Sequence, residues 1–154
     1  MRRAGWRALW GMLALAICVS AHGATPEARA AFKATMKQAN ADYTAARAHC
    51  RAQSGHERSV CIAEAKASLR KAEADAQASL RDSERARSDA RVAGAKADYQ
   101  VDRAKCANRI GDERRACLRD ARARQQETMS GAVKDERAPN LAVKPPAVPH
   151  TRTP

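Results

Sequence analysis

Four cysteines are the residues of this chain best suited to chemistry, and they form two pairs with the same spacing. Ten residues separate Cys50 from Cys61, and ten separate Cys106 from Cys117. Cysteine pairs close disulfides, act as redox dithiols or, together with histidines, bind zinc or copper. The surroundings of the two pairs indicate which of these chemistries applies.

The two cysteine pairs belong to a duplicated segment of the sequence. Residues 41–67 align without a gap to residues 97–123, 56 positions later. Twelve aligned positions are identical: Ala41/Ala97, Asp42/Asp98, Tyr43/Tyr99, Arg47/Arg103, Ala48/Ala104, Cys50/Cys106, Gly55/Gly111, Glu57/Glu113, Arg58/Arg114, Cys61/Cys117, Ala65/Ala121 and Ala67/Ala123. The cysteines, the glycine between them and several charged residues are therefore the shared features that any interpretation has to explain.

Metal binding is a weak alternative for the first pair, because His49 and His56 flank its cysteines. The second copy has Lys105 and Asp112 at these positions, so it keeps both cysteines but neither histidine. We therefore expect no metal and no cofactor, and His49 and His56 remain only weak candidates as ligands. Redox catalysis is also disfavoured, because active dithiols are usually closely spaced and often lie at a helix N-terminus.

A disulfide-closed helical hairpin is the structure that the repeated unit favours. Gly55 and Gly111 would each end a helix in the left-handed conformation, as a C′ residue without a Cβ penalty. Asp112 would then cap the helix that follows Gly111. The apolar positions before Gly55 recur in steps of four and three, as in a coiled-coil seam: Phe32, Met36, Ala39, Tyr43, Ala46 and Cys50.

The two cysteines of one hairpin would then lie at nearly the same height below the bend. Four cysteines allow three pairings, and the local pairs Cys50–Cys61 and Cys106–Cys117 are the ones that the repeat favours. The disulfides would compensate for a poor core, because alanine supplies most of the apolar positions. Closing a short loop of this kind contributes about 3 kcal/mol in the chain-entropy model.

The first residues of the chain have the features of a secretory signal peptide. Arg2, Arg3 and Arg7 precede a short apolar run at residues 8–19, and small residues follow. We expect residues 1–23 to be this leader, removed with Cys18, which would leave an even number of cysteines in an oxidising compartment. The predicted location is therefore periplasmic or secreted.

The rest of the chain predicts an elongated, alanine-rich, all-α protein of three helices over residues 24–137. Thr25, Pro26 and Glu27 are good signals for the start of the first helix, which we expect to run to about Ser54. A long central helix from Glu57 to Ile110 follows, with Gly94 as the place where it would bend or break. The third helix would begin near Asp112 and fade between Ser130 and Asp135. Two bends then give a Z-like arrangement, and a break at Gly94 would give a three-helix bundle instead.

Charges spaced three or four apart, such as Lys71/Asp75 and Asp120/Arg124, are expected to pair along the solvated helical faces. Residues 138–154 hold five of the six prolines and are expected to form a disordered tail.

The chain is strongly basic, with a formal net charge of +12 that falls to +9 without the three leader arginines. Nucleic acid is not the expected partner, because a secreted chain does not meet it and no aromatic platform is present for stacking bases. Lipid phosphate, lipopolysaccharide and peptidoglycan are the anions that a basic envelope protein would meet. Whether two chains form a homodimer stays open.

The repeated pattern resembles a family of uncharacterised signal-peptide-bearing proteins of proteobacteria, of Burkholderiales type, that are labelled TolA-like or cell-envelope biogenesis proteins. The residues that carry this resemblance are Tyr43, Arg47, Cys50, Gly55, Arg58, Cys61 and Ala65, repeated from Tyr99 to Ala121. The resemblance implies a periplasmic protein and no known catalytic residues.

The sequence therefore predicts a non-enzymatic protein with a structural, stress-related or binding role at the cell envelope. No nucleophile elbow, phosphate loop or His/Asp/Ser arrangement is present to support hydrolysis or group transfer. The alternatives are a thiol-redox or metal-handling protein and a binder of anionic envelope polymers or lipids.

Overall fold

The computed structural model describes residues 24–142, and this part of the chain is helical apart from its ends and turns. The elements are α1 (Pro26–Cys50), α2 (Gly55–Arg81), α3 (Glu84–Lys105) and α4 (Gly111–Ala142). The predicted all-α class is confirmed. The predicted number of three helices is wrong, because two helices, α2 and α3, replace the long central one.

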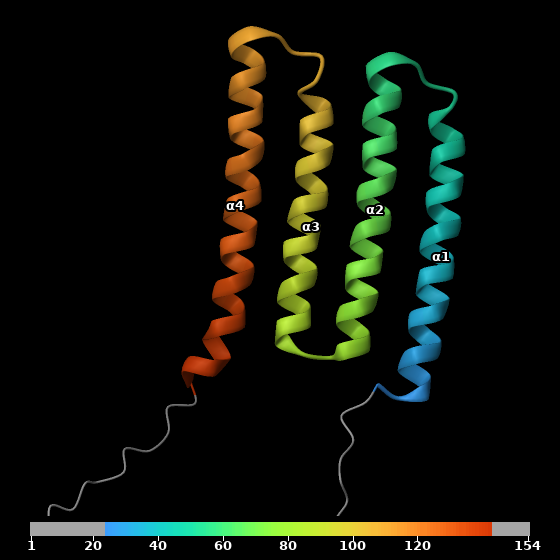
Figure 1. Ribbon diagram of the computed structural model, residues 1–154, viewed down its shortest axis with the longest axis vertical. Helices are drawn as coiled ribbons and strands as arrows, with labels where there is room; N and C mark the ends of the chain where they lie inside the picture. The colour runs from blue at the N-terminus through green and yellow to red at the C-terminus, as the bar shows by residue number, and fades with distance from the viewer. Residues whose placement is uncertain (1–23, 143–154) are drawn as a thin grey trace, which may run out of the picture.

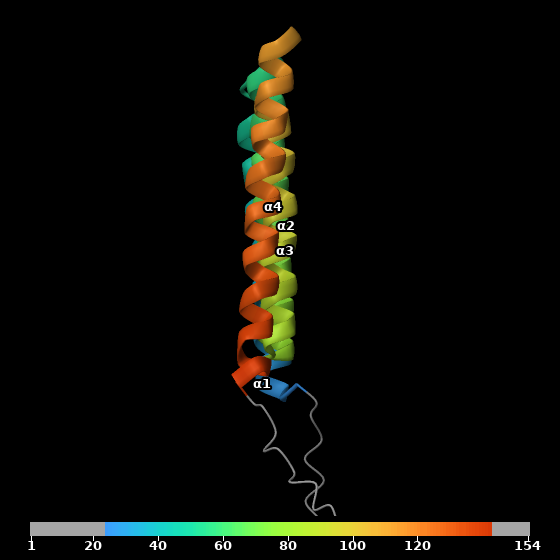
Figure 2. The ribbon, with the colours of Figure 1, turned by 90° about the vertical axis from the view of Figure 1, so that its left-hand side faces the viewer.

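The four helices lie side by side in a single layer, and each runs antiparallel to its neighbour (Figure 1). Within residues 24–142 only consecutive helices contact each other: α1 with α2, α2 with α3, and α3 with α4. A view from the side shows that the layer is one helix thick (Figure 2). The expected elongated shape is confirmed, whereas the Z-like arrangement and the three-helix bundle are both wrong, because α2 and α3 fold against each other.

The start and the packed stripe of α1 agree with the sequence. The Thr25 hydroxyl accepts a hydrogen bond from the backbone N–H of Ala28 at 3.1 Å, and Pro26 opens the helix. The predicted seam residues are all buried or half-buried, whereas the positions between them are exposed: Phe32, Met36, Ala39, Tyr43, Ala46 and Cys50. Helix α1 lies at the edge of the layer, so it packs this one stripe against α2.

The break in the long helix lies at Asp82 and Ser83 rather than at Gly94. Asp82 has a left-handed backbone with φ of 41°, and the Ser83 hydroxyl accepts a hydrogen bond from the N–H of Ala86 at 3.1 Å. Asp tolerates the left-handed region better than most residues, and Ser is a strong N-cap. Gly94 lies inside α3, where an added Cβ would meet the Lys71 side chain only at ordinary van der Waals distance, 3.8 Å.

Alanine forms the contact between the two central helices. Ala67 of α2 packs with Ala97 and Val101 of α3, and Ala63 lies against them. Nearer the α2–α3 turn, a second cluster joins the following residues: Ala74, Ala78, Ala86 and Ala90. Small side chains allow helix axes to approach to the short end of the usual range of roughly 8–10 Å. The contact therefore has a small apolar area and close backbones.

Two expectations concern the ends of the chain. Helix α4 continues to Ala142, so the predictions that the last helix fades by Asp135 and that residues 138–142 are disordered are both wrong. The predicted signal peptide at residues 1–23 and the tail at residues 143–154 lie outside the described residues. No helix within residues 24–142 is both long enough and apolar enough to span a membrane.

Candidate functional site

The structure joins the cysteines in the predicted pairs. Cys50 is bonded to Cys61 with a Cα–Cα distance of 5.6 Å, and Cys106 is bonded to Cys117 with a Cα–Cα distance of 5.8 Å. Cys50 and Cys106 are almost completely buried, and their partners are half-buried. Each bridge links two neighbouring helices just below a bend, and both bends lie at the same end of the layer (Figure 1).

The two bends use glycine as expected, but at a different place in the turn. Gly55 and Gly111 both have φ of 54°, where a side chain would be strained although the space around the glycine is open. Helix α1 ends at Cys50 rather than near Ser54, and three successive turn bonds follow, the last from Gln53 N to Cys50 O at 3.2 Å. The glycines therefore open the next helix instead of ending the previous one.

The same shift moves Asp112. It lies in the first turn of α4 and forms an ion pair with Arg115, so its predicted role as the N-cap is wrong.

The weak metal candidates His49 and His56 line one hollow at the stapled end, between α2 and the neighbouring bends. The hollow has a volume of about 750 Å³ and is lined by His49, Gln53, His56, Glu57, Val60, Cys61, Glu64, Lys105, Asn108 and Arg109. Cys50 and Cys61 are bonded to each other, so neither offers a thiolate to a metal. Within residues 24–142 no group of three or more His, Cys, Asp or Glu side chains is placed to hold a metal ion.

Several ion pairs connect neighbouring helices. Lys71 Nζ lies 2.6 Å from Asp98 Oδ1 across α2 and α3, so Lys71 does not use the expected partner Asp75. Lys105 Nζ lies 3.0 Å from Glu64 Oε1 between the same helices. Spacing within one helix cannot reveal such pairs, because they depend on which helices become neighbours.

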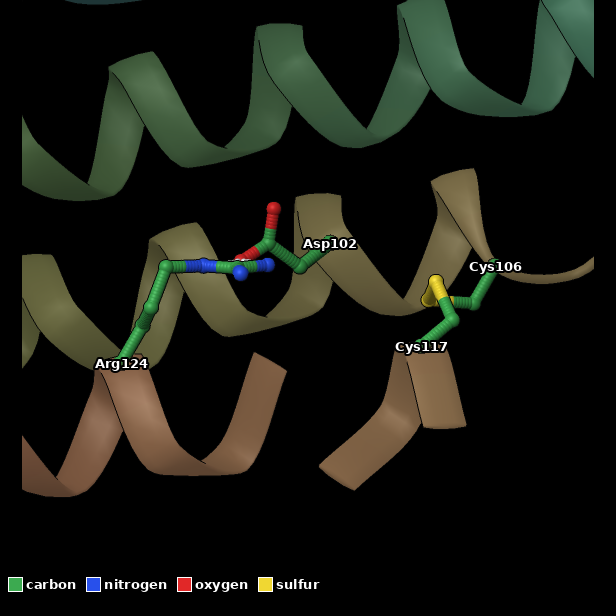
Figure 3. Close-up of a disulfide and its surroundings, with 4 residues drawn as sticks. All are labelled: Asp102, Cys106, Cys117 and Arg124. Carbon is green, nitrogen blue, oxygen red and sulfur yellow. Dashed lines mark hydrogen bonds and ion pairs between the residues drawn. A yellow bond between two sulfur atoms is a disulfide. The ribbon is translucent and has the colours of Figure 1, made fainter. Parts of the chain in front are cut away.

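A further cross-helix pair lies close to the second disulfide. Arg124 of α4 points toward Asp102 of α3, with Nη2 3.0 Å from Oδ2 (Figure 3). The expected pairing of Arg124 with Asp120 is therefore replaced by a pairing with the facing helix. Arg124 also donates from Nε to the same oxygen at 3.2 Å, so both of its bonds converge on one atom.

The conserved spacing of Tyr and Arg within the two copies has a structural role. The guanidinium of Arg47 lies 5.7 Å from the centre of the Tyr43 ring, and that of Arg103 lies 5.8 Å from the Tyr99 ring. These are cation–π contacts between residues one turn apart. The two arginines therefore face tyrosine rings of their own helices.

The duplicated motif and its surroundings match no protein-family model, and comparisons with curated proteins and with solved structures also found no match.

Proposed function

We propose that this chain is a non-enzymatic, secreted or periplasmic protein that acts at the cell envelope as a rigid binding surface. The observation that carries the proposal is the pair of disulfides, each closing one helical bend at the same end of a flat layer. Disulfides persist in oxidising compartments, which supports a location outside the cytoplasm. The resemblance to envelope proteins of proteobacteria agrees with this location.

A binding role fits the shape better than a catalytic one. An active site normally needs a concave pocket in which several functional groups converge. The hollows described along residues 24–142 are open grooves between neighbouring helices, and the cysteines nearest to them are bonded to each other. A layer one helix thick exposes two broad sides, which is an arrangement suited to contact with a large partner.

The experiment that tests this proposal measures the state of the sulfurs and the location together. The tagged protein is expressed in a Gram-negative host, fractionated and alkylated with and without prior reduction, and then examined by mass spectrometry and metal analysis. We expect the periplasmic fraction, no free thiol without reduction, and no stoichiometric metal. A thiol that cycles between states, or one metal ion per chain, would favour the redox or metal-handling alternative and overturn the proposal.

A further inference from the structure

The layer has two broad sides, and contacts between helices identify one of them. A hollow between α1 and α2 is lined by Asp42 and Ser68, and its counterpart between α3 and α4 is lined by Asp98 and Arg124. Lys71 of α2 reaches Asp98 on the same side. This side, which we call the mixed face, carries both carboxylates and cations: Asp42, Glu64, Ser68, Lys71, Asp98, Lys105 and Arg124.

The opposite side can be found by counting along each helix. A helix turns by about 100° per residue, so positions two or nine residues from a residue of the mixed face point to the other side of the layer. Positions five residues away are rotated by about 140°, so they also point toward the other side. Exposed cations occupy such positions on all four helices, and we call their surface the basic face: Arg47, Lys66, Arg70, Lys96, Arg103 and Arg122.

A second groove confirms this assignment independently of the counting. It lies between α2 and α3 and is lined by Ser59, Ile62, Lys66, Arg70 and Gln100, together with alanines of the α2–α3 contact. Lys71 and Asp98, which link the same two helices on the mixed face, do not line it. The groove therefore lies on the basic face, with two cations, a hydroxyl and an amide at its edges.

Carboxylates near the stapled end are kept away from the basic face. Glu57 and Glu64 line the hollow at the stapled end, on the mixed face. The duplication places Glu113 and Asp120 in the equivalent positions. Asp102 points toward Arg124 (Figure 3). The nearest carboxylates on the side of the basic face, Glu73 and Asp89, lie toward the α2–α3 turn. The positive charge of the basic face is therefore not neutralised locally.

The cations of the basic face also lack ion-pair partners within residues 24–142. Arg47 and Arg103 lie over tyrosine rings, and Arg122 donates from Nε to the Tyr99 hydroxyl at 3.3 Å. These contacts hold the side chains without removing their charge. By contrast, Lys71, Lys105 and Arg124 of the mixed face each pair with a carboxylate.

We infer that the basic face docks on the surface of an anionic phospholipid bilayer, where lipid phosphates lie against its lysines and arginines. The four helices lie side by side in a single layer (Figures 1 and 2). This shape favours a bilayer over a polymer strand, because the cations of the basic face come from all four helices rather than from the edges of one groove. The short groove between Lys66 and Arg70 is suited to one headgroup phosphate. The inference rests on the proposed function in placing the protein beside a membrane.

The test compares two variants that lose the same charge from opposite sides of the layer. The basic-face variant combines Lys66→Gln, Arg70→Gln and Lys96→Gln, and the mixed-face control combines Lys71→Gln, Lys105→Gln and Arg124→Gln. The oxidised protein, as secreted, is sedimented with phosphatidylcholine vesicles that contain or lack phosphatidylglycerol, at low and high salt. Circular dichroism confirms that both variants keep the helical fold.

We expect binding only to the vesicles with phosphatidylglycerol, and weaker binding as salt is added. The basic-face variant should lose roughly a hundredfold in partitioning, because each basic residue near an anionic surface contributes about a factor of five. The mixed-face control should lose no more than about threefold, because its cations are already paired and face away from the membrane.

Equal losses in the two variants would overturn the inference, because net charge alone would then explain binding. Binding to soluble lipopolysaccharide or polyphosphate without binding to the vesicles would also overturn it, in favour of a polymer ligand. Neither result depends on the sulfur state or the location of the protein. The proposed function is therefore tested separately, by the alkylation and fractionation experiment.

Discussion

The two stapled hairpins share their bends but differ in what holds their helices together. In the first hairpin the contact between α1 and α2 is apolar. Phe32 and Ala46 of α1 and Leu69 of α2 are half-buried there. The equivalent residues in the second hairpin, 56 positions later, are Ser88, Asp102 and Gln125. The disulfide, the glycine and the Tyr–Arg contact are kept, whereas these three contact positions become polar.

Two of the polar residues at the contact of the second hairpin, Ser88 and Asp102, form specific bonds with α4. Ser88, only 2% exposed, donates from its hydroxyl to the carbonyl oxygen of Ala132 at 3.0 Å. Arg91 donates to the same oxygen at 3.3 Å, and Arg124 pairs with Asp102. Hydrogen bonds and exposed ion pairs contribute less than apolar burial and depend on geometry and salt. The comparison indicates that the second hairpin relies more on its disulfide.

The sharpest way to break this comparison is to remove each disulfide in turn. The pair Cys106→Ala with Cys117→Ala, and separately Cys50→Ala with Cys61→Ala, should each lower the free energy of unfolding by about 3 kcal/mol. Hydrogen exchange should show that α4 loses more protection when the second disulfide is removed than α1 loses when the first is removed, because the seam of α1 is apolar. Equal loss in α1 and α4 would contradict the contrast between the seams.

The contact between the hairpins can be tested with a matched pair of identical residues. Ala97 is 1% exposed because α2 covers it, whereas its duplicate Ala41 is exposed at the outer edge of α1. Overpacking by Ala97→Leu should cost about 1–3 kcal/mol in urea unfolding. The control Ala41→Leu should stay within about 0.5 kcal/mol of the wild type. Similar effects at both positions would contradict the observed order of the helices.

The buried hydroxyl of the second hairpin should have a smaller effect. Ser88→Ala removes the hydrogen bond to Ala132 and should lower the free energy of unfolding by about 1 kcal/mol. Ser130→Ala, on an exposed position of α4, is the control and should leave the thermal midpoint nearly unchanged. No difference between the two variants would mean that the Ser88 bond does not hold α3 and α4 together.

The ion pair near the second disulfide should contribute less again. Asp102→Ala with Arg124→Ser restores the residues of the first hairpin, Ala46 and Ser68, and should cost about 0.2–1 kcal/mol at low salt. The Arg124 side chain is 60% exposed, so added salt should screen the pair and shrink this difference. A cost that persists in high salt would point to packing rather than charge.

The smallest expected effect concerns the first turns of α1 and α3. The pKa of Glu27 is lowered mainly by its own backbone N–H and by Thr25, and the pKa of Glu84 is lowered mainly by its hydrogen bond to Arg87. Each carboxylate therefore stabilises the fold above its unfolded pKa, and this contribution is lost as pH falls through the lowered folded value. Carboxyl NMR titration should find both pKa values below those of an unfolded control, and Arg87→Gln should raise only that of Glu84.

One missed feature was available in the sequence without any structure. The start of α1 at Thr25 and Pro26, moved by the 56-residue period, falls on Arg81 and Asp82, where the chain turns between α2 and α3. The three residues at this turn also carry a start signal for a helix. Asp82 adopts the left-handed conformation, Ser83 is the N-cap, and Glu84 is an acidic residue in the first turn of α3. Applying the repeat to the helix starts, and not only to the cysteines, would have predicted four helices.

The sequence by itself determined the helical class, the two disulfides, the glycine bends and the seam of α1. These features are local: they depend on residue periods and on cysteines only eleven positions apart, so the chain near each feature contains the whole signal. Only the tertiary structure decided which identical alanines are buried, which charges pair and which side of the layer is basic. Those properties depend on which helices become neighbours, because packing brings together residues such as Lys71 and Asp98 that have no relation along one helix.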